Sequence, residues 1–478
     1  MEYEVVMGLE VHIELATESK LFCSCSAKFG AEPNENICPA CSGMPGMLPA
    51  VNKRAIELGI IASYLLGCEI SDKVIFDKKN YFYPDLPTGY QLTQLAAPIG
   101  RNGSIEIQAD NGKKTITIKQ IHIEEDAGKL LHDPRIGVTL VDYNRASVPL
   151  VEIVSNPDFT TANEVIEYLS KLQGIFTYAG VSDCKMQEGS MRCDVNLSVR
   201  KRGDKAYGIR TEIKNMNSFK AIARAIAYES ERHIDAIERK TEVLIQETRG
   251  WNDEKGFSFS MRSKENAADY RYFPYADALE VAISKEWVAS LIKTIPELPE
   301  AKLNRYINDY GLSERESAIL LSDSALSRLF DDTVNFYCEP KEISNWIIVD
   351  LLSFVKSENF KLELISLSAK KLACLIKMYK DNKINRASGR KVFLELIKSD
   401  IEVEEYVKDN GLMIDTSAID IDALINEVIS AELDIAKEYK TGNEKVAGYF
   451  MGKVMRRTKG KADPKIVNQK LIDKLLSL

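Results

Sequence analysis

The chain has 478 residues, a formal net charge of −8 and 28% charged side chains. At roughly 150 residues per domain, this length predicts about three domains. No window approaches the roughly 20 apolar residues of a membrane span, and no signal-peptide stretch opens the sequence. We therefore expect a large cytoplasmic protein with reduced cysteines. The negative total argues weakly against a surface devoted wholly to nucleic acid.

Four cysteines lie close together near the start: Cys23 and Cys25, followed by Cys38 and Cys41. Each short turn can place two thiolates on one ion, and the intervening loop brings the second pair over, so the spacing predicts a zinc knuckle. A disulfide framework is the alternative, but it belongs to short secreted chains. A zinc ion with four protein ligands has no open position for a substrate, so the chemistry must lie elsewhere.

The first part of the chain reads as short β-rich runs broken by Gly, Pro and Asn, for example at 114–123, 191–199 and 207–214. Two helical stretches interrupt these runs, at 51–66 and 161–176. This pattern predicts a mixed α+β domain with an antiparallel sheet over residues 1–293.

The remainder of the chain looks helical. Pro296 and Pro299 mark a linker, and Ser313 with Glu316 forms a capping-box pattern before an apolar run. A second break is expected around 410–417, ahead of three further helix starts at Asp420, Asn443 and Asp463-Pro464. We predict an all-α domain over residues 294–409 and a helical tail over residues 410–478.

Polar side chains share one face of several predicted strands. In the first strand, the period of two sends Glu10, His12 and Glu14 to the face opposite the leucine, valine and isoleucine side chains. The same alternation recurs in three later strands, with His122 and Glu124, with Arg192, Asp194 and Asn196, and with Arg210, Glu212 and Lys214. Glu125 and Asp126 follow at the end of the second of these four strands.

An ordinary solvated face explains such residues on any single antiparallel strand. Carboxylates are depleted from strands and repel one another across them, so acids on several strands beside a histidine suggest a bound cation. Hard oxygen ligands near cationic side chains favour Mg²⁺ holding triphosphate oxygens. The chain has no P-loop sequence, so any nucleotide is held in another way.

The last stretch is locally basic. Lys453, Arg456 and Arg457 share one helical face opposite an apolar flank, and Lys459 and Lys461 lie in the turn that follows. Such a surface can follow a phosphate backbone. A solvated helix face is the other explanation of this charge run.

A set of longer motifs spans the whole first domain. They are MGLEVH at 7–12, the C-x-C and C-P-x-C knuckle, YFYPDLP at 81–87, IHIEEDAGK at 121–129, VDYNR at 141–145, QEGSMRCDVN at 187–196, EIKNMN at 212–217 and DYRYFP at 269–274. Together with TKGKADPK at 458–465, which is similar to the end of a YqeY-like tail, they resemble the GatB/GatE family over essentially the full length. GatE proteins carry an inserted synthetase-like domain for which this chain has no room, which favours the GatB branch.

The resemblance implies the GatB component of an aspartyl/glutamyl-tRNA amidotransferase, with a cradle-like ATP-using domain, a helical domain and a tail that grips tRNA. Such a component phosphorylates the side-chain carboxylate of Glu-tRNA(Gln) or Asp-tRNA(Asn). Ammonia then comes from a GatA-type glutaminase subunit, in a complex that also holds a small GatC-type subunit. Gln91, Asn215 and Asn217 are candidates for lining the ammonia passage. The expected cofactors are ATP, Mg²⁺ and Zn²⁺.

The residues and the resemblance together predict the site. The expected magnesium ligands are Glu10, His12, Glu124, Glu125 and Asp194, with His12 neutral. The expected catalytic residues are Glu10, His12, Glu125, Asp194, Arg192 and Lys214, of which the last two would oppose charge on the transferred phosphoryl group. The expected nucleotide contacts are Lys20, Arg210, Glu188 and Glu212, although a solvated lysine is the other reading of Lys20.

The remaining expected sites are zinc at Cys23, Cys25, Cys38 and Cys41, and tRNA at Lys453, Arg456, Arg457, Lys459 and Lys461. Two other functions stay open at this point. One is a zinc-containing tRNA-binding protein that delivers substrate to a catalytic partner. The other is a synthetase-like ligase that acts on a free amino acid.

Overall fold

The computed structural model describes residues 2–133, 135, 137–263, 270–358, 367–414, 420–439, 443, 445–458, 462 and 464–477. The chain divides into two compact units, Met1–Leu298 and Pro299–Leu478. Within the described residues, every helix is too short or too polar to cross a membrane.

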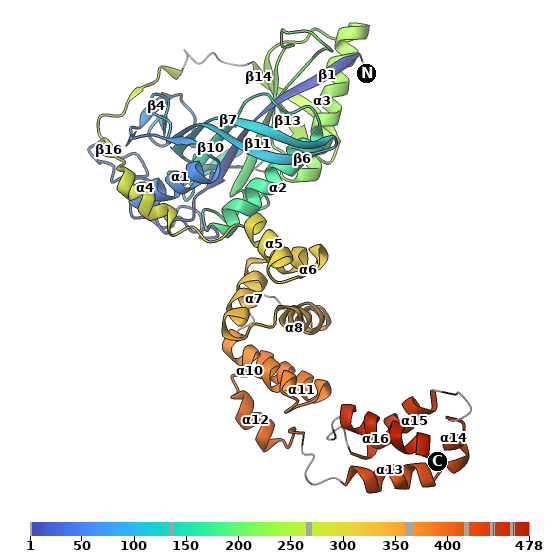
Figure 1. The fold of residues 1–478 in the computed structure, drawn as a ribbon. Helices are drawn as coiled ribbons and strands as arrows, with labels where there is room; N and C mark the ends of the chain where they lie inside the picture. The colour runs from blue at the N-terminus through green and yellow to red at the C-terminus, as the bar shows by residue number, and fades with distance from the viewer. Residues whose placement is uncertain are drawn as a thin grey trace. The chain divides into compact units, whose positions relative to one another are not determined.

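The first unit is built on a nine-stranded sheet with the order β14-β13-β12-β11-β1-β10-β7-β6-β2 (Figure 1). Its strands are β1 (Tyr3–Glu14), β2 (Glu69–Ile70), β6 (Gly100–Ala109), β7 (Gly112–Glu125), β10 (Pro149–Ser155), β11 (Met191–Lys201), β12 (Thr211–Lys214), β13 (Glu247–Asn252) and β14 (Phe257–Ser263). Neighbouring strands are antiparallel except β12 and β13. Strand β1 lies at the centre, so both of its edges are covered.

One face of this sheet is apolar and carries helices α1 (Lys53–Leu65), α2 (Ala162–Tyr178) and α3 (Phe219–Arg239) (Figure 1). The predicted first two helices are confirmed, with Asn52 and Thr161 as their N-caps. Helix α3 is an addition that the sequence analysis did not predict. Its buried Ala221, Ile222 and Ala225 recur at helical spacing, but charged residues separate them along the sequence.

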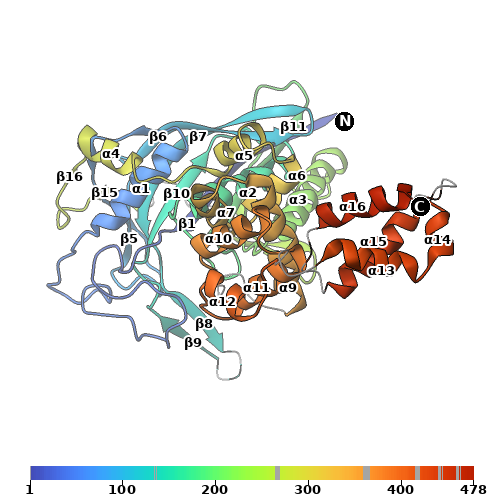
Figure 2. The same ribbon diagram turned by 60° about the horizontal axis from the view of Figure 1, so that its bottom comes forward.

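Smaller sheets surround the large one. They are β15 (Phe273–Pro274), β4 (Asp77–Asn80) and β5 (Tyr90–Thr93); β16 (Val281–Ala282) with β3 (Lys73–Val74); and the hairpin of β8 (Lys129–Asp133) and β9 (Val138–Asp142), which is visible in Figure 2. Helix α4 (Lys285–Ile292) packs against α1. Because β5 contacts β7, the three-stranded sheet lies beside the polar end of the large sheet.

Every described element of the second unit is helical, which confirms the predicted change of fold class. The helices are α5 (Pro299–Asn308), α6 (Glu314–Leu321), α7 (Ser324–Phe336), α8 (Pro340–Asn345), the π-helical segment Trp346–Leu351, α9 (Leu352–Ser357), α10 (Ala369–Lys380), α11 (Arg386–Lys398), α12 (Val403–Asp409), α13 (Ile421–Ser430), α14 (Leu433–Lys437), α15 (Lys445–Arg457) and α16 (Pro464–Ser477). The capping box of Ser313 and Glu316 forms as predicted. Two separate apolar cores lie at 306–407 and 421–475. The domain boundaries near 293 and 410 stay predictions.

Candidate active site

The face of the large sheet opposite the helices opens into a pocket of about 650 Å³, which we call the carboxylate pocket. Its polar lining comes from six strands and from the segment before β15, and includes Glu10, His12, Lys79, His122, Glu124, Glu152, Asn196, Arg210, Glu212, Lys214, Tyr270 and Tyr272. The predicted polar face of several strands is therefore the wall of a single cavity.

Strand register explains why these side chains meet. In β1, Glu10 lies opposite Asp194 of β11, and His12 lies opposite Glu152 of β10. Directly opposed residues of antiparallel strands point to the same face of a sheet. Local alternation therefore selects which residues are polar on each strand, and pairing between distant segments turns them into clusters.

The first cluster consists of His12, Glu124 and Glu152, whose ligand atoms lie within 4.8 Å of one another. The Nε2 atom of His12 is 3.5 Å from Glu124 Oε1 and 3.8 Å from Glu152 Oε1. Octahedral Mg²⁺ with bonds of about 2.1 Å places its ligand atoms about 3 to 4 Å apart, so the spacing fits this ion. Burial lowers the pKa of His12, which keeps the ring neutral as a metal ligand requires.

The two carboxylates of this cluster differ in charge. Burial, and then the charge of Glu152, raises the pKa of Glu124 to about 8. Burial alone would also raise the pKa of Glu152, but a hydrogen bond from His122 and the charges of His12 and Lys79 lower it to about 2. Glu124 therefore resists ionisation beside Glu152, and a cation between the two would favour the ionised pair.

The second cluster consists of Glu10, Asp194 and Glu212, again with ligand atoms within 4.8 Å of one another. The Nζ atom of Lys214 forms ion pairs with Asp194 and, at 3.4 Å, with Glu212. The amide of Asn196 donates a hydrogen bond of 3.0 Å to Glu10. Burial, followed by the charges of three neighbouring carboxylates, raises the pKa of Glu10. This set also offers hard oxygen ligands to a divalent cation.

Three residues of the pocket were not predicted from the sequence: Glu152, His122 as its partner, and Lys79. A single acid in the apolar run at 150–154 was the available signal for Glu152. The Nδ1 atom of His122 lies 2.9 Å from Glu152 Oε2, and its Nε2 atom is buried without a hydrogen-bond partner among the described residues. Lys79 comes from β4, outside the large sheet, so no pattern in the polar strands could indicate it.

Arg192 does not line the carboxylate pocket, although we predicted a phosphoryl contact for it. Its guanidinium group binds Asp126 through two contacts, of 2.5 and 3.2 Å, and Arg145 approaches the same carboxylate at 3.5 Å. Glu14 lies nearby, and burial followed by the charge of Asp126 raises its pKa to about 7. The demand for a counter-ion at Asp126 explains why Arg192 turns away from the pocket.

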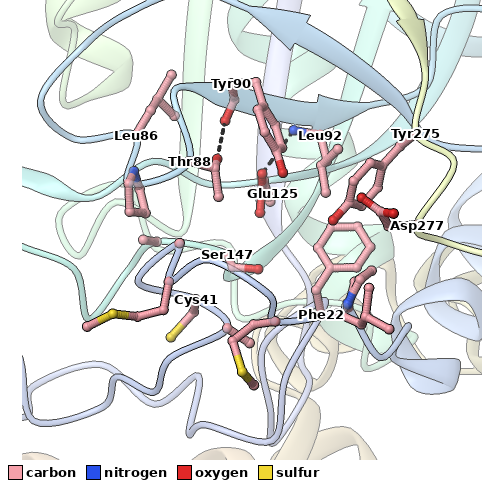
Figure 3. A pocket seen from close by; sticks show the side chains of 18 of the residues that line it. Phe22, Cys41, Leu86, Thr88, Tyr90, Leu92, Glu125, Ser147, Tyr275 and Asp277 are labelled. Atoms are coloured by element: carbon pink, nitrogen blue, oxygen red, sulfur yellow. Dashed lines mark hydrogen bonds between the residues drawn. The ribbon is translucent and has the colours of Figure 1, made fainter.

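Glu125 also lies apart from the predicted cluster, in a second pocket of about 240 Å³ that we call the knuckle pocket (Figure 3). Its Oε1 atom accepts a hydrogen bond of 2.9 Å from the backbone of Leu92, and burial raises its pKa to about 7. Consecutive residues of a strand point to opposite faces. Glu124 and Glu125 consequently cannot hold the same ion, which corrects the predicted ligand set.

The four knuckle cysteines come together as predicted, with all four sulfur atoms within 4.8 Å of one another. The Sγ atom of Cys41 lies 3.8 Å from that of Cys38 and 4.0 Å from that of Cys25. Tetrahedral zinc with bonds of about 2.3 Å places its sulfur ligands about 3.8 Å apart, so the set fits this ion.

Two predicted nucleotide contacts lie away from the carboxylate pocket. Lys20 is fully buried, and its Nζ atom is 3.6 Å from Cys41 Sγ and 3.0 Å from the carbonyl oxygen of Tyr143. Its charge thus compensates cysteine thiolates instead of phosphates. Glu188 lies in an exposed loop with Lys185 at 3.2 Å. Neither position was distinguishable in the sequence, because no local pattern fixes the path of a loop.

The predicted tRNA-contacting residues Lys453, Arg456 and Arg457 lie together on α15 and line one shallow pocket. Lys453 forms an ion pair with Glu432, and Arg457 forms one of 2.5 Å with Glu427. The opposite side of the helix is buried. The other two predicted residues, Lys459 and Lys461, lie outside the described residues.

Comparisons with known proteins follow this geometry. A family described as the GatB/GatE catalytic domain matches residues 5–289, and one described as the GatB domain matches residues 328–475. The chain is 48% identical over 476 residues to the GatB component of the aspartyl/glutamyl-tRNA(Asn/Gln) amidotransferase from Lachnoclostridium phytofermentans, with 99% of each chain covered. It is 46% identical to the protein of that name from Thermodesulfovibrio yellowstonii and 43% identical to that from Carboxydothermus hydrogenoformans, with 100% of each chain covered.

Proposed function

Because this chain belongs to the GatB/GatE family of tRNA-dependent amidotransferases, we propose that it activates a misacylated tRNA with ATP. The substrate is the side-chain carboxylate of Glu-tRNA(Gln), Asp-tRNA(Asn) or both. Phosphorylation gives an acyl phosphate, and ammonia then displaces the phosphate to form the amide. A free carboxylate is a poor acyl donor because oxide is a poor leaving group, and the phosphoryl group removes that obstacle.

The observation that carries the proposal is the pair of carboxylate clusters at one pocket of about 650 Å³. A pocket that held a polyphosphate directly against five carboxylates would repel it, so a protein that only binds tRNA gains nothing from these residues. Mg²⁺ held by His12, Glu124 and Glu152, and by the Glu10 cluster, would neutralise ATP phosphate charge and align the phosphates.

The side chains of the pocket have separable roles in this reaction. Lys214 holds Asp194 and Glu212 in place through its ion pairs. Arg210 lies exposed at the pocket lining, where its charge can meet a phosphate oxygen. His12 stays neutral, and His122 orients Glu152 through their hydrogen bond. These residues position and stabilise charge, because phosphoryl transfer asks little covalent chemistry of the protein.

The cysteine cluster would hold Zn²⁺ as a structural ion, since all four ligand positions are filled by sulfur. We further propose that a GatA-type amidase subunit supplies ammonia in a cytoplasmic complex with a GatC-type subunit. The basic face of α15 would contact the phosphates of the tRNA body. Gln91, whose amide donates a hydrogen bond of 2.8 Å to the carbonyl oxygen of Glu125, stays a candidate for the ammonia passage together with Asn215 and Asn217.

The product of ATP cleavage tests the function. The assembled complex is incubated with ATP, Mg²⁺ and Glu-tRNA(Gln) or Asp-tRNA(Asn), and the nucleotides are separated. We expect ADP to form only with the charged tRNA, and hydroxylamine to trap an activated acyl group. AMP and pyrophosphate would instead indicate the synthetase-like ligase. No cleavage, with tRNA binding intact, would indicate a delivery protein.

A further inference from the structure

Lys79 is surrounded by aromatic rings at the end of the carboxylate pocket that holds the His12 cluster. Its Nζ atom lies 5.0 Å from the ring centre of Tyr270 and 5.6 Å from that of Tyr81. Tyr272 also lines the pocket, with its ring centre 6.0 Å from that of Tyr270. Ring faces attract an ammonium group but leave its three N–H donors unused.

The ring contacts are a built feature of the fold. The side-chain amide of Asn80 donates a hydrogen bond of 2.9 Å to the carbonyl oxygen of Arg271 and one of 3.4 Å to that of Tyr270. The next residues continue as β15, in which Phe273 pairs with Lys78 of β4. Two segments that are distant in the sequence are thus fixed around one lysine.

The two pocket lysines Lys79 and Lys214 differ in their partners. Lys214 is occupied by Asp194 and Glu212, as described above. Lys79 has no carboxylate oxygen within 4.0 Å in the part of the chain that the structure describes, although Glu124 and Glu152 line the same pocket. Its donors face a space in which a ligand with negatively charged oxygens would satisfy them.

We propose that Lys79 is a catalytic residue whose ammonium group donates hydrogen bonds to the oxygens of the phosphoryl group as it leaves ATP. The inference rests on the proposed phosphoryl transfer. An oxygen of the aminoacyl carboxylate forms a bond to the γ-phosphorus, the bond from that phosphorus to the bridging oxygen breaks, and ADP leaves with the electron pair. Lys79 neither gains nor loses a proton. It offsets charge on the equatorial oxygens, which the rings help to shield from water.

The test is the rate of ADP formation in a single turnover by the assembled complex, with Mg²⁺, ATP and Glu-tRNA(Gln). Removal of one preorganised donor of this kind lowers a chemical step by about 100-fold, which is the loss we expect for Lys79→Ala. Equilibrium binding of ATP should change by no more than about 3-fold, because the contact strengthens only in the transition state. Methylammonium should restore part of the rate to Lys79→Ala and leave the wild type unchanged.

Lys78→Ala is the matched control. Lys78 is the preceding residue of β4 and also lies over aromatic rings, 4.3 Å from the ring centre of Tyr90 and 4.8 Å from that of Tyr275, but it does not line the carboxylate pocket. Its variant should form ADP within about 3-fold of the wild-type rate, as expected for a site outside the pocket. Lys79→Gln keeps most of the stem between the rings, and serves as the second variant if Lys79→Ala folds poorly.

The outcomes separate the two proposals. If the wild type makes ADP with charged tRNA and Lys79→Gln does so equally fast, the role of Lys79 is refuted and the proposed function stands. If excess Mg²⁺ alone restores the wild-type rate to the variants, Lys79 acts through the metal ligands and the inference is also refuted. If the wild type itself makes no ADP, the proposed function fails.

Discussion

The carboxylate pocket and the knuckle pocket lie on opposite sides of the end of β7 and differ in chemistry. The first holds hard oxygen and imidazole ligands on strands of a rigid sheet, with about 650 Å³ of space in front of them. The second adjoins four sulfur ligands on loops, which fill a tetrahedral ion completely. An open ligand set leaves room for a substrate, whereas a closed one stabilises the fold. Ligand type and vacancy therefore separate a chemical site from a structural site within one domain.

The loss of a carboxylate from the open set should have the largest effect. Glu152→Gln removes a charged ligand atom, and we expect ADP formation to fall about 1,000-fold, or about 4 kcal/mol in the barrier. Rates are measured in the assembled complex with charged tRNA at saturating Mg²⁺. Glu106→Gln, on the exposed part of β6, is the matched control and should keep its rate. A Glu152→Gln variant with near wild-type turnover would remove this residue from the site.

Neighbouring residues at the end of β7 test the division between the pockets directly. Glu124→Gln should raise the Mg²⁺ concentration for half-maximal ADP formation about 100-fold, because a ligand of the His12 cluster is lost. Glu125→Gln should leave the Mg²⁺ dependence within about 2-fold of the wild type, whatever it does to the overall rate, because its side chain faces the knuckle pocket. Equal shifts in Mg²⁺ dependence would place both carboxylates on one ion, against the register described here.

The closed set should respond in the opposite way. Cys38→Ser with Cys41→Ser is expected to abolish zinc binding and make the loop at 23–48 more sensitive to proteases. ADP formation should fall by less than about 10-fold, because the carboxylate pocket does not depend on the knuckle for its ligands. Metal analysis and limited proteolysis provide the measurements. Cys338→Ser, at an exposed cysteine outside the cluster, is the control. Zinc that stayed stoichiometric in the double variant would show that the ligands lie elsewhere.

The smallest effect is expected at the basic face of α15, where the charges are exposed to solvent. Arg456→Ala should weaken tRNA binding only about 3-fold and reduce the salt slope of log K by about 1, the signature of one lost phosphate contact. Lys370→Ala on α10 is the surface control. Binding measured at several salt concentrations checks this. An unchanged slope would assign tRNA recognition to another surface.

Much of the architecture could be predicted because its signals are local. The alternation around Glu10 and His12, the helix caps at Asp420 and Ser313, and the cysteine spacing each depend on residues a few positions apart. Helix α3 was missed because the charged residues between its apolar positions weakened the pattern. Lys20 was assigned to phosphate because a buried lysine next to thiolates looks, in sequence, like any exposed one.

The sequence by itself determined the fold classes, the polar face of the strands and the soft, four-cysteine ligand set. Only the tertiary structure decided that the acids form two clusters, that Glu152 and Lys79 belong to the pocket, and that Glu125 does not. The physical reason is range. Periodicity records the direction of a side chain relative to its own strand, whereas a site depends on the register between strands that are more than a hundred residues apart in the sequence.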